Sequence, residues 1–289
     1  MFKTNIDFDQ LEFGIYTDID EVDYHSSPGI SKHNLDLINK SPATYRYKLV
    51  APKDDDENKA FIFGGAVHAY VLEQHKFNNH YAVANFLDMR TKAAKQFKEE
   101  NADKRVLTMK DMATVAAIEQ AIRQHDVASI LLDKDSGIAE ASAYWCDDNK
   151  FLWKDEKPTY RLCRCRPDFI NTAHNVVIDL KTTLCAGLSL FTRDVVNYRY
   201  HVQAAFYVDG LRALGCDVQT FIFIAVEKEA PYNIGIYELS ADDLKFGRSL
   251  YQRNLKTYSQ CLETKSWPGY DKDIRLIELP PWAKRVDIY

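Results

Sequence analysis

Residues 161–183 read RLCRCRPDFINTAHNVVIDLKTT, two strand-like patterns joined by a short polar turn. Asp168 lies before the turn, and Asp179 lies two residues before Lys181 in the second pattern. Because successive side chains of a strand point to opposite faces, Asp179 and Lys181 share one face and Leu180 points into a core. An acid that holds a divalent cation, beside an amine that steers a water, suits hydrolysis of a phosphodiester. The stretch therefore predicts a metal-dependent phosphodiesterase site on a β-sheet.

Length and composition allow one large folded unit. The chain has 289 residues, of which 46% are apolar, enough for a single core or a core with a helical annex. No segment approaches the roughly 20 consecutive apolar residues of a membrane span, and residues 1–10 have no apolar segment of a signal peptide. We expect a soluble cytoplasmic protein without a membrane partner.

The net charge is −5, from 37 basic and 42 acidic residues, which by itself argues against a nucleic-acid partner. The charge is unevenly distributed, however. Residues 1–23 contain seven acids and one base, whereas residues 157–212 contain eight bases and four acids. Scattered bases usually belong to ordinary solvated surface, but this basic stretch coincides with the acid–lysine pattern. Since local charge decides which surface meets a phosphate backbone, DNA remains a candidate partner.

The order of elements predicts an α/β fold. Helix patterns begin at Ser31 as an N-cap and at Pro42, and continue through 61–74 and 88–132. Strand patterns follow at 139–145, 159–166 and 176–183, then one helical stretch over 188–215, strands at 218–227 and 233–240, and a helix at 244–263. We expect one domain over 1–289: a mainly helical part (1–137) and a core (138–289) whose central mixed β-sheet is flanked by helices.

Several motifs carry a resemblance to a known family. Pro167-Asp168 and Asp179-Leu180-Lys181 are similar to the motif of the PD-(D/E)XK (restriction-endonuclease-like) nuclease superfamily. The strings CRCRPD, DLKTT, YRYHVQAAFY and the late WP…LPPWAK resemble the C-terminal exonuclease domain of RecE (exonuclease VIII). The P-D…D-x-K pattern alone is weak, but it occurs here between Gly64-x-x-x-His68 and Gln203-x-x-x-Tyr207. The resemblance covers most of the chain and is strongest from residue 138 onward.

The resemblance implies a metal site and a catalytic lysine. Asp168, Asp179 and the backbone carbonyl of Leu180 are expected to hold Mg²⁺, for which Mn²⁺ substitutes, and Lys181 to orient the attacking water. His68 and Glu140 are expected to complete the site or to hold a second ion. A lone histidine such as His68 is more often structural, and only the downstream motifs favour the metal site. The remaining histidines considered are assigned to surface or structure: His25, His33, His75, His80, His125 and His174.

DNA contacts are expected from a helix and a strand. Gln203 and Tyr207 lie four residues apart and so share one helix face. The resemblance implies that this pair positions DNA, although Tyr207 could instead pack on the sheet. Phosphate contacts are expected from the arginines of one strand face and the following helix, namely Arg161, Arg164, Arg166 and Arg199, with Arg193 nearby.

The implied activity is degradation of duplex DNA from its ends, 5′ to 3′, leaving 3′ single strands for an annealing protein of the RecT type. The resemblance also implies a ring-shaped homo-oligomer in the cytoplasm of a bacterium, encoded by the bacterium or by a phage or prophage. Three alternatives remain open: a structure-specific or restriction-like endonuclease, a non-catalytic DNA-binding recombination scaffold, and an unrelated α/β metabolic enzyme. The last lacks support, since the chain has no P-loop and no dinucleotide-binding glycine motif.

Overall fold

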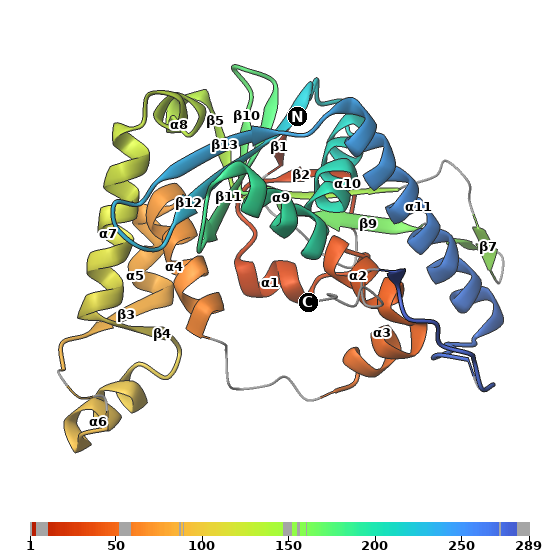
Figure 1. The fold of residues 1–289 in the computed structure, drawn as a ribbon, viewed down its shortest axis with the longest axis horizontal. Helices are drawn as coiled ribbons and strands as arrows, with labels where there is room; N and C mark the ends of the chain where they lie inside the picture. The colour runs from red at the N-terminus through yellow and green to blue at the C-terminus, as the bar shows by residue number, and fades with distance from the viewer. Residues whose placement is uncertain are drawn as a thin grey trace, which may run out of the picture.

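The computed structural model describes residues 2–3, 11–51, 59–86, 88, 90–146, 152–154, 157–159, 161–271 and 273–281. Its centre is a five-stranded sheet with the strand order β13-β12-β11-β10-β5 (Figure 1). In sequence order these strands are β5 (Gly137–Ala139), β10 (Phe169–Asn171), β11 (Val176–Thr183), β12 (Thr220–Glu227) and β13 (Ile234–Glu238). Strands β11 and β12 are parallel and the other neighbours antiparallel, so the predicted mixed sheet is confirmed.

A second sheet continues from the first through a bend. Its order is β1-β2-β6-β9, made of β1 (Phe2–Lys3), β2 (Gly14–Tyr16), β6 (Ser142–Cys146) and β9 (Leu162–Cys165). The chain bends between β5 and β6 and again between β9 and β10. The stretch 139–145, which was predicted as one strand, is therefore divided between two strands. Glu140 lies at the bend with a left-handed φ of 48°, and its N–H donates to the carbonyl of Asp168 at 3.0 Å. This backbone conformation is uncommon for a residue with a Cβ.

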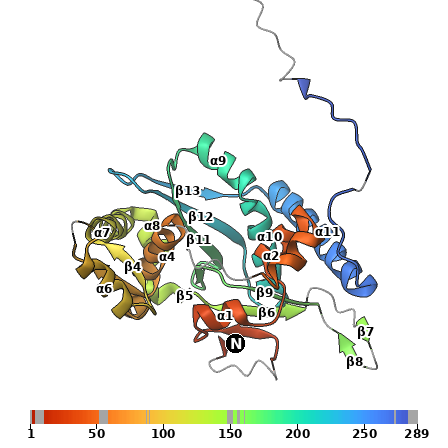
Figure 2. The same ribbon diagram turned by 90° about the horizontal axis from the view of Figure 1, so that it is seen from below.

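Helices cover both faces of the central sheet (Figure 2). One layer holds α2 (Lys32–Lys40), α3 (Pro42–Lys48), α9 (Leu188–Asn197), α10 (Tyr200–Ala213) and α11 (Ala241–Thr264). The other layer holds α4 (Lys59–Leu72), α5 (Phe77–His80), α6 (Lys92–Glu100), α7 (Met109–Gln124) and α8 (Asp126–Leu131), with the parallel pair β3 (Tyr81–Ala84) and β4 (Arg105–Thr108). The remaining elements are α1 (Glu21–Ser26), the 3₁₀ turns η2 (Gln74–Lys76) and η3 (Lys134–Ser136), and the hairpin β7 (Leu152–Lys154)–β8 (Lys157–Thr159).

Alternation along β11 separates two hydrophobic cores. Val177 packs in the core beneath α10 and α11, whereas Ile178 and Leu180 pack in the core beneath α4 and α7. Leu180 is fully buried, as its place between two polar residues predicts. Asp179 and Lys181 consequently face α10, whereas α4 covers the opposite side of the strand.

Local sequence signals place most helix ends. Ser31 caps α2 in a capping box with Asn34, and Pro42 occupies the first turn of α3, both as predicted. The single helix expected over 188–215 is instead two, α9 and α10. The chain turns at Arg199, whose φ of 56° is left-handed and ends the helical hydrogen-bond ladder. Among the described helices, none is both long and apolar enough to cross a membrane.

Candidate metal centre and active site

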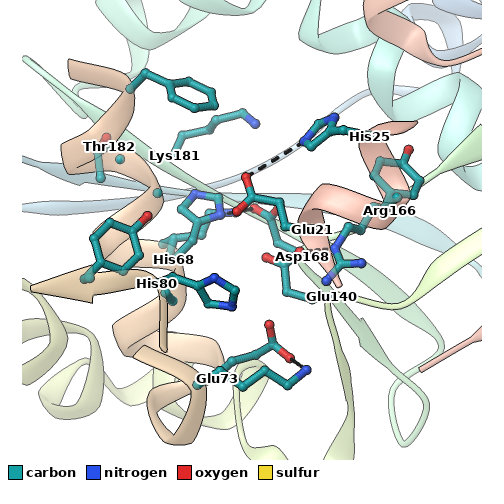
Figure 3. Close-up of a pocket in the computed structure, with 18 of the residues that line it drawn as sticks. Glu21, His25, His68, Glu73, His80, Glu140, Arg166, Asp168, Lys181 and Thr182 are labelled. Carbon is teal, nitrogen blue, oxygen red and sulfur yellow. Dashed lines mark hydrogen bonds and ion pairs between the residues drawn. The ribbon is translucent and has the colours of Figure 1, made fainter. Parts of the chain in front are cut away.

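A pocket of about 500 Å³ opens where α1, α4 and the bend between the two sheets meet (Figure 3). Its walls carry both carboxylates and cations. The acidic groups are Asp20, Glu21, Glu73, Glu140 and Asp168, and the basic or imidazole groups are His25, His68, Lys76, His80, Arg166 and Lys181. The chemistry expected from residues 161–183 therefore faces a cavity and not a flat surface.

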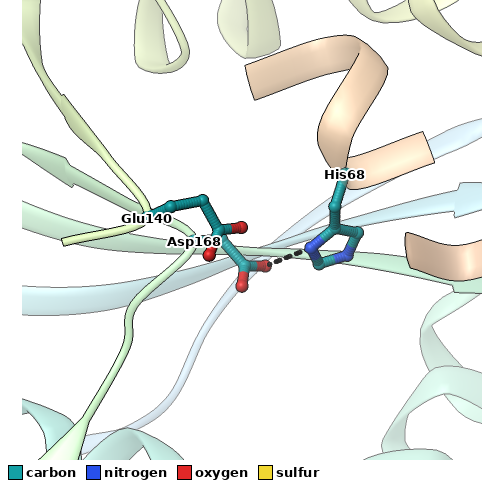
Figure 4. A group of neighbouring side chains, drawn as sticks. All are labelled: His68, Glu140 and Asp168. Carbon is teal, nitrogen blue, oxygen red and sulfur yellow. Dashed lines mark ion pairs between the residues drawn. The ribbon is translucent and has the colours of Figure 1, made fainter. Parts of the chain in front are cut away.

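Three side chains from separate elements form a candidate cation site (Figure 4). His68 projects from α4, Glu140 from the bend after β5, and Asp168 from the residue before β10. One ligand atom from each of these residues lies within 4.8 Å of the other two. His68 Nδ1 is 3.5 Å from Asp168 Oδ2. No other such group of three occurs among the residues that the structure describes.

The backbone of β11 fixes Asp168. Pairing between β10 and β11 starts at Phe169 and Ile178, so the next residues of β11 extend past the end of β10. The amide of Leu180 donates to Asp168 Oδ2 at 2.7 Å in place of a strand partner. Because the N–H and C=O of one strand residue point to the same edge, the Leu180 carbonyl also faces the pocket, which Leu180 lines. The predicted backbone ligand is thus beside the trio.

Arg166 holds Glu140 in place. Its Nε donates to Glu140 Oε2 at 2.8 Å, and its Nη1 donates to Ser142 Oγ at 2.9 Å and to the carbonyl of Ile19 at 2.8 Å. These bonds fix the guanidinium, and through it the carboxylate at the bend. The left-handed backbone of Glu140 is therefore stabilised from both its amide and its side chain.

Electrostatics favour a cation among these groups. Burial and the neighbouring Asp168 raise the pKa of Glu140 to about 7. Burial and Asp179 raise the pKa of Asp168 well above its ordinary value, whereas burial lowers the pKa of His68 and favours the neutral imidazole. Two carboxylates that resist ionisation beside one another and a neutral imidazole suit a divalent cation. The donor set fits Mg²⁺ or Mn²⁺ and includes the Leu180 carbonyl.

Asp179 lies next to the trio but is joined to other residues. Its Oδ2 is 2.5 Å from Lys181 Nζ, and its Oδ1 accepts the side-chain amide of Gln203 at 2.5 Å. Asp179 Oδ2 is buried, and the Lys181 ammonium is its partner. Asp179 is not one of the three residues whose ligand atoms lie within 4.8 Å of one another, and its expected metal ligation stays a prediction.

Lys181 is held between an acid and an aromatic ring. Burial lowers the pKa of Lys181, but Asp179 and Asp168 outweigh that effect, so the net pKa is raised and the ammonium keeps its charge. The Nζ atom also lies 4.7 Å from the centre of the Tyr200 ring, within cation–π range. The amine predicted from D-x-K is therefore charged and positioned at the pocket.

Comparison with protein families matches residues 31–279 to the PDDEXK-like domain of unknown function (DUF3799). The chain belongs to this family. Its fold is that of the PD-(D/E)XK nuclease superfamily, as the motifs predicted. The family match spans both the helical part that carries His68 and the core that carries Asp168.

Comparison with solved structures agrees on the fold of this PDDEXK-like protein. A crystal structure of a candidate exonuclease from Eubacterium rectale has a TM-score of 0.57 and 14% identity, covering 87% of this chain and 90% of that chain. A crystal structure of SSO0001 covers 76% of this chain and 84% of that chain at 15% identity, but its TM-score of 0.29 supports no argument. Comparison with curated proteins finds no significant match.

The predicted DNA-positioning pair of this PDDEXK-like protein has two different environments. Gln203 is buried and donates to Asp179, so its amide supports an acid of the site. Tyr207 lines the pocket, and burial raises its pKa well above the ordinary value, which keeps the phenol neutral. The ring also packs against the sheet, with its centroid 6.2 Å from that of Phe221. In this arrangement Tyr207, and not the Gln203 amide, is exposed to a ligand in the pocket.

The arginines expected on one strand face do not act together. Arg164 is 7% exposed and donates to the carbonyls of Tyr24, Ser27 and His25. The guanidinium is buried against α1 in this structure, so it offers little surface to a phosphate, and the expected contact stays a prediction. Arg199 is engaged in an ion pair, since its Nε donates to Asp36 Oδ1 of α2 at 2.8 Å.

The other two arginines lie in different places. Arg161 donates to Ser259 Oγ of α11 at 3.3 Å, whereas Arg166 lines the pocket and holds Glu140. Strand alternation could not separate these roles, because only β9 itself (Leu162–Cys165) is extended and both Arg161 and Arg166 flank it. Trp282, Ala283 and Lys284 of the late motif lie outside the described residues.

Sequence reasoning missed one wall of the pocket. The acidic N-terminal segment supplies Asp20 and Glu21, and two histidines assigned to surface or structure, His25 and His80, also line the cavity. His80 Nε2 is 3.6 Å from Asp20 Oδ2, and Arg105 Nη1 is 2.9 Å from Glu21 Oε2. Helix α1 therefore connects to β4 and to the end of α5 across the pocket. No local pattern indicates such a contact.

Proposed function

We propose that this PDDEXK-like protein is a metal-dependent exonuclease of duplex DNA that works 5′ to 3′ and leaves 3′ single-stranded tails. One observation supports the proposal: His68, Glu140 and Asp168 place three candidate metal ligands close together, beside the charged amine of Lys181, in one pocket. The finer assignment as an exonuclease rests on the RecE-like motifs. The proposal also includes the expected partners, which are DNA ends and an annealing protein of the RecT type. It further includes assembly of several copies of the chain into a ring in a bacterial cytoplasm.

The residues divide the work of hydrolysis. His68, Glu140, Asp168 and the Leu180 carbonyl would hold Mg²⁺ or Mn²⁺, which when bound polarises a phosphate and lowers the pKa of a coordinated water. Lys181 brings a fixed positive charge to the attacking water and to the extra negative charge of the pentavalent phosphate. The Gln203 amide donates to Asp179, and the Tyr200 ring lies against the Lys181 ammonium. These two contacts hold the pair in place on β11.

The test compares substrates with and without ends. Linear duplex labelled at either end, with or without a 5′-phosphate, is incubated with and without Mg²⁺, beside a covalently closed circular duplex. We expect release of nucleotides from the 5′ end of the linear DNA, complete dependence on the metal, and no loss of the circle. Cutting of the circle would instead indicate an endonuclease. Binding without cleavage in any divalent metal would indicate a scaffold.

A further inference from the structure

Helix α4 continues the pocket wall beyond the candidate metal centre. Phe61, Gly64, Gly65 and His68 follow the spacing of one helix face, and all four line the pocket. His68 is at the inner end of this face, and Phe61 lies two turns closer to the start of the helix. The face therefore leads from the cation site to an aromatic ring.

The ring of Phe61 is exposed but held. Phe61 lines the pocket, and 56% of its surface is nevertheless exposed to solvent. The guanidinium carbon of Arg105 is 5.7 Å from the Phe61 ring centre and 5.9 Å from that of Tyr81. Arg105 is in turn bound to Glu21. The ring is thus supported by a fixed cation, which leaves aromatic surface toward the cavity in a preorganised position.

Two glycines lie between Phe61 and His68 on this face of α4. Gly64 and Gly65 have no side chains, and a Cβ added to Gly65 would come within 2.6 Å of Tyr81 Oη. The Tyr81 hydroxyl therefore covers the α4 backbone at Gly65. At Gly64 an added Cβ would meet only Thr182 Oγ1, at 3.6 Å, so a flexible chain can approach the backbone there. A strand running from the cation site to Phe61 would pass over Gly64 and beside the Tyr81 hydroxyl, both of which line the pocket.

The distance suits a nucleotide chain. Seven residues of α-helix span about 10 Å, and stacked nucleotides advance roughly 3.4 Å each, so Phe61 lies about two to three nucleotides from a phosphate at His68. We propose that Phe61 is a stacking platform for an unpaired base of the DNA strand. This inference rests on the proposed nuclease function and adds the place where the strand is held. Aromatic stacking suits a nuclease that accepts all sequences, since every base has a π-face.

The expected effect is on binding. Loss of one base–aromatic stack lowers affinity by about 5- to 150-fold. Phe246 provides a matched control, because it is 57% exposed on α11, does not line the pocket, and stacks on His201 at 5.8 Å. An effect specific to Phe61 therefore separates base stacking from the general loss of an exposed aromatic ring.

The experiment uses the full chain with Lys181→Ala, so that DNA is bound but not degraded. Linear duplexes with a short single-stranded end carry 2-aminopurine at successive positions, and quenching of its fluorescence reports stacking. We expect the strongest quenching about two to three nucleotides from the bound phosphate, its loss with weaker binding in Phe61→Ala, its retention in Phe61→Trp, and no change in Phe246→Ala.

Two results would overturn the inference, and they differ in meaning. If Phe61→Ala keeps the quenching and affinity of its parent while the wild-type chain degrades DNA, the platform is elsewhere and the nuclease proposal stands. If the wild-type chain neither binds nor degrades DNA with Mg²⁺ or Mn²⁺, both the inference and the proposed function fail.

Discussion

Gln203 donates its side-chain amide to Asp179 Oδ1 at 2.5 Å, joining helix α10 to the central strand β11. Both residues are buried, and Lys181 lies on the other oxygen of the same carboxylate. An amide on an otherwise apolar helix face is therefore explained by the acid that it orients. This bond ties the downstream Gln203-x-x-x-Tyr207 motif to the Asp179-Leu180-Lys181 motif.

Replacing Gln203 by Leu should reduce both stability and activity. The substitution keeps the volume but leaves Asp179 Oδ1 buried without its donor, which costs about 1–3 kcal/mol. We expect that loss in the free energy of unfolding from urea denaturation, together with a lower cleavage rate at saturating DNA. Gln252→Ala, at an exposed position of α11, is the control. Unchanged stability and rate in Gln203→Leu would contradict the assigned role.

Replacing Lys181 by Ala should separate binding from chemistry. The amine supplies charge at the reacting phosphate, so we expect cleavage to fall on the order of 10²-fold or more while duplex binding is nearly unchanged. Rates of nucleotide release and binding by fluorescence anisotropy measure the two effects. Lys256→Ala on the exposed side of α11 is the control. A variant with near-normal turnover would reject the catalytic assignment of Lys181.

Glu140 should make stability and metal binding depend on pH. Its folded-state pKa is about 7, above the ordinary 4.5, because burial and Asp168 disfavour the anion. Between these values the folded protein holds more protons at this site than the unfolded chain. The contribution of Glu140 to stability is therefore present below pH 4.5 and is lost as pH rises toward 7.

Metal binding should follow the opposite trend. A cation needs the Glu140 anion, so Mg²⁺ should raise the Tm more at about pH 8 than at about pH 5.5. Thermal melts with and without saturating Mg²⁺ measure this difference, and Glu140→Gln should reduce it. An equal Mg²⁺-induced increase at both pH values in the wild-type chain would argue against Glu140 as a ligand.

Replacing Arg164 by Leu should affect folding and not DNA binding. The guanidinium donates to the buried carbonyl of Ser27 and the partly buried carbonyl of His25. Its loss leaves the Ser27 carbonyl unpaired, at a cost of about 2–3 kcal/mol. Urea denaturation should detect this loss. The dependence of DNA affinity on salt should keep its slope, since a residue that contacts no phosphate releases no counterion. A shallower slope with normal stability would restore Arg164 as a DNA contact.

Local pattern was sufficient for several features of the fold and site. Strand alternation placed Leu180 in a core and put Asp179 and Lys181 on the opposite face. A cap at Ser31 and a proline at position 42 marked two helix starts. These predictions held because each depends on residues that are close in sequence and on backbone geometry that repeats every two or 3.6 residues.

The meeting of His68, Glu140 and Asp168 was decided by the tertiary structure. For this cluster the sequence provides only a resemblance in the order of the motifs, because hydrophobic periodicity does not indicate which distant segments pack together. Glu140 reaches the site through a left-handed bend, and Arg199 splits a continuous helical pattern by the same kind of turn. Both conformations oppose local preference and persist because surrounding contacts stabilise them. The inward turn of Arg164 and the placing of α1 over the pocket likewise follow from long-range packing, which local sequence does not encode.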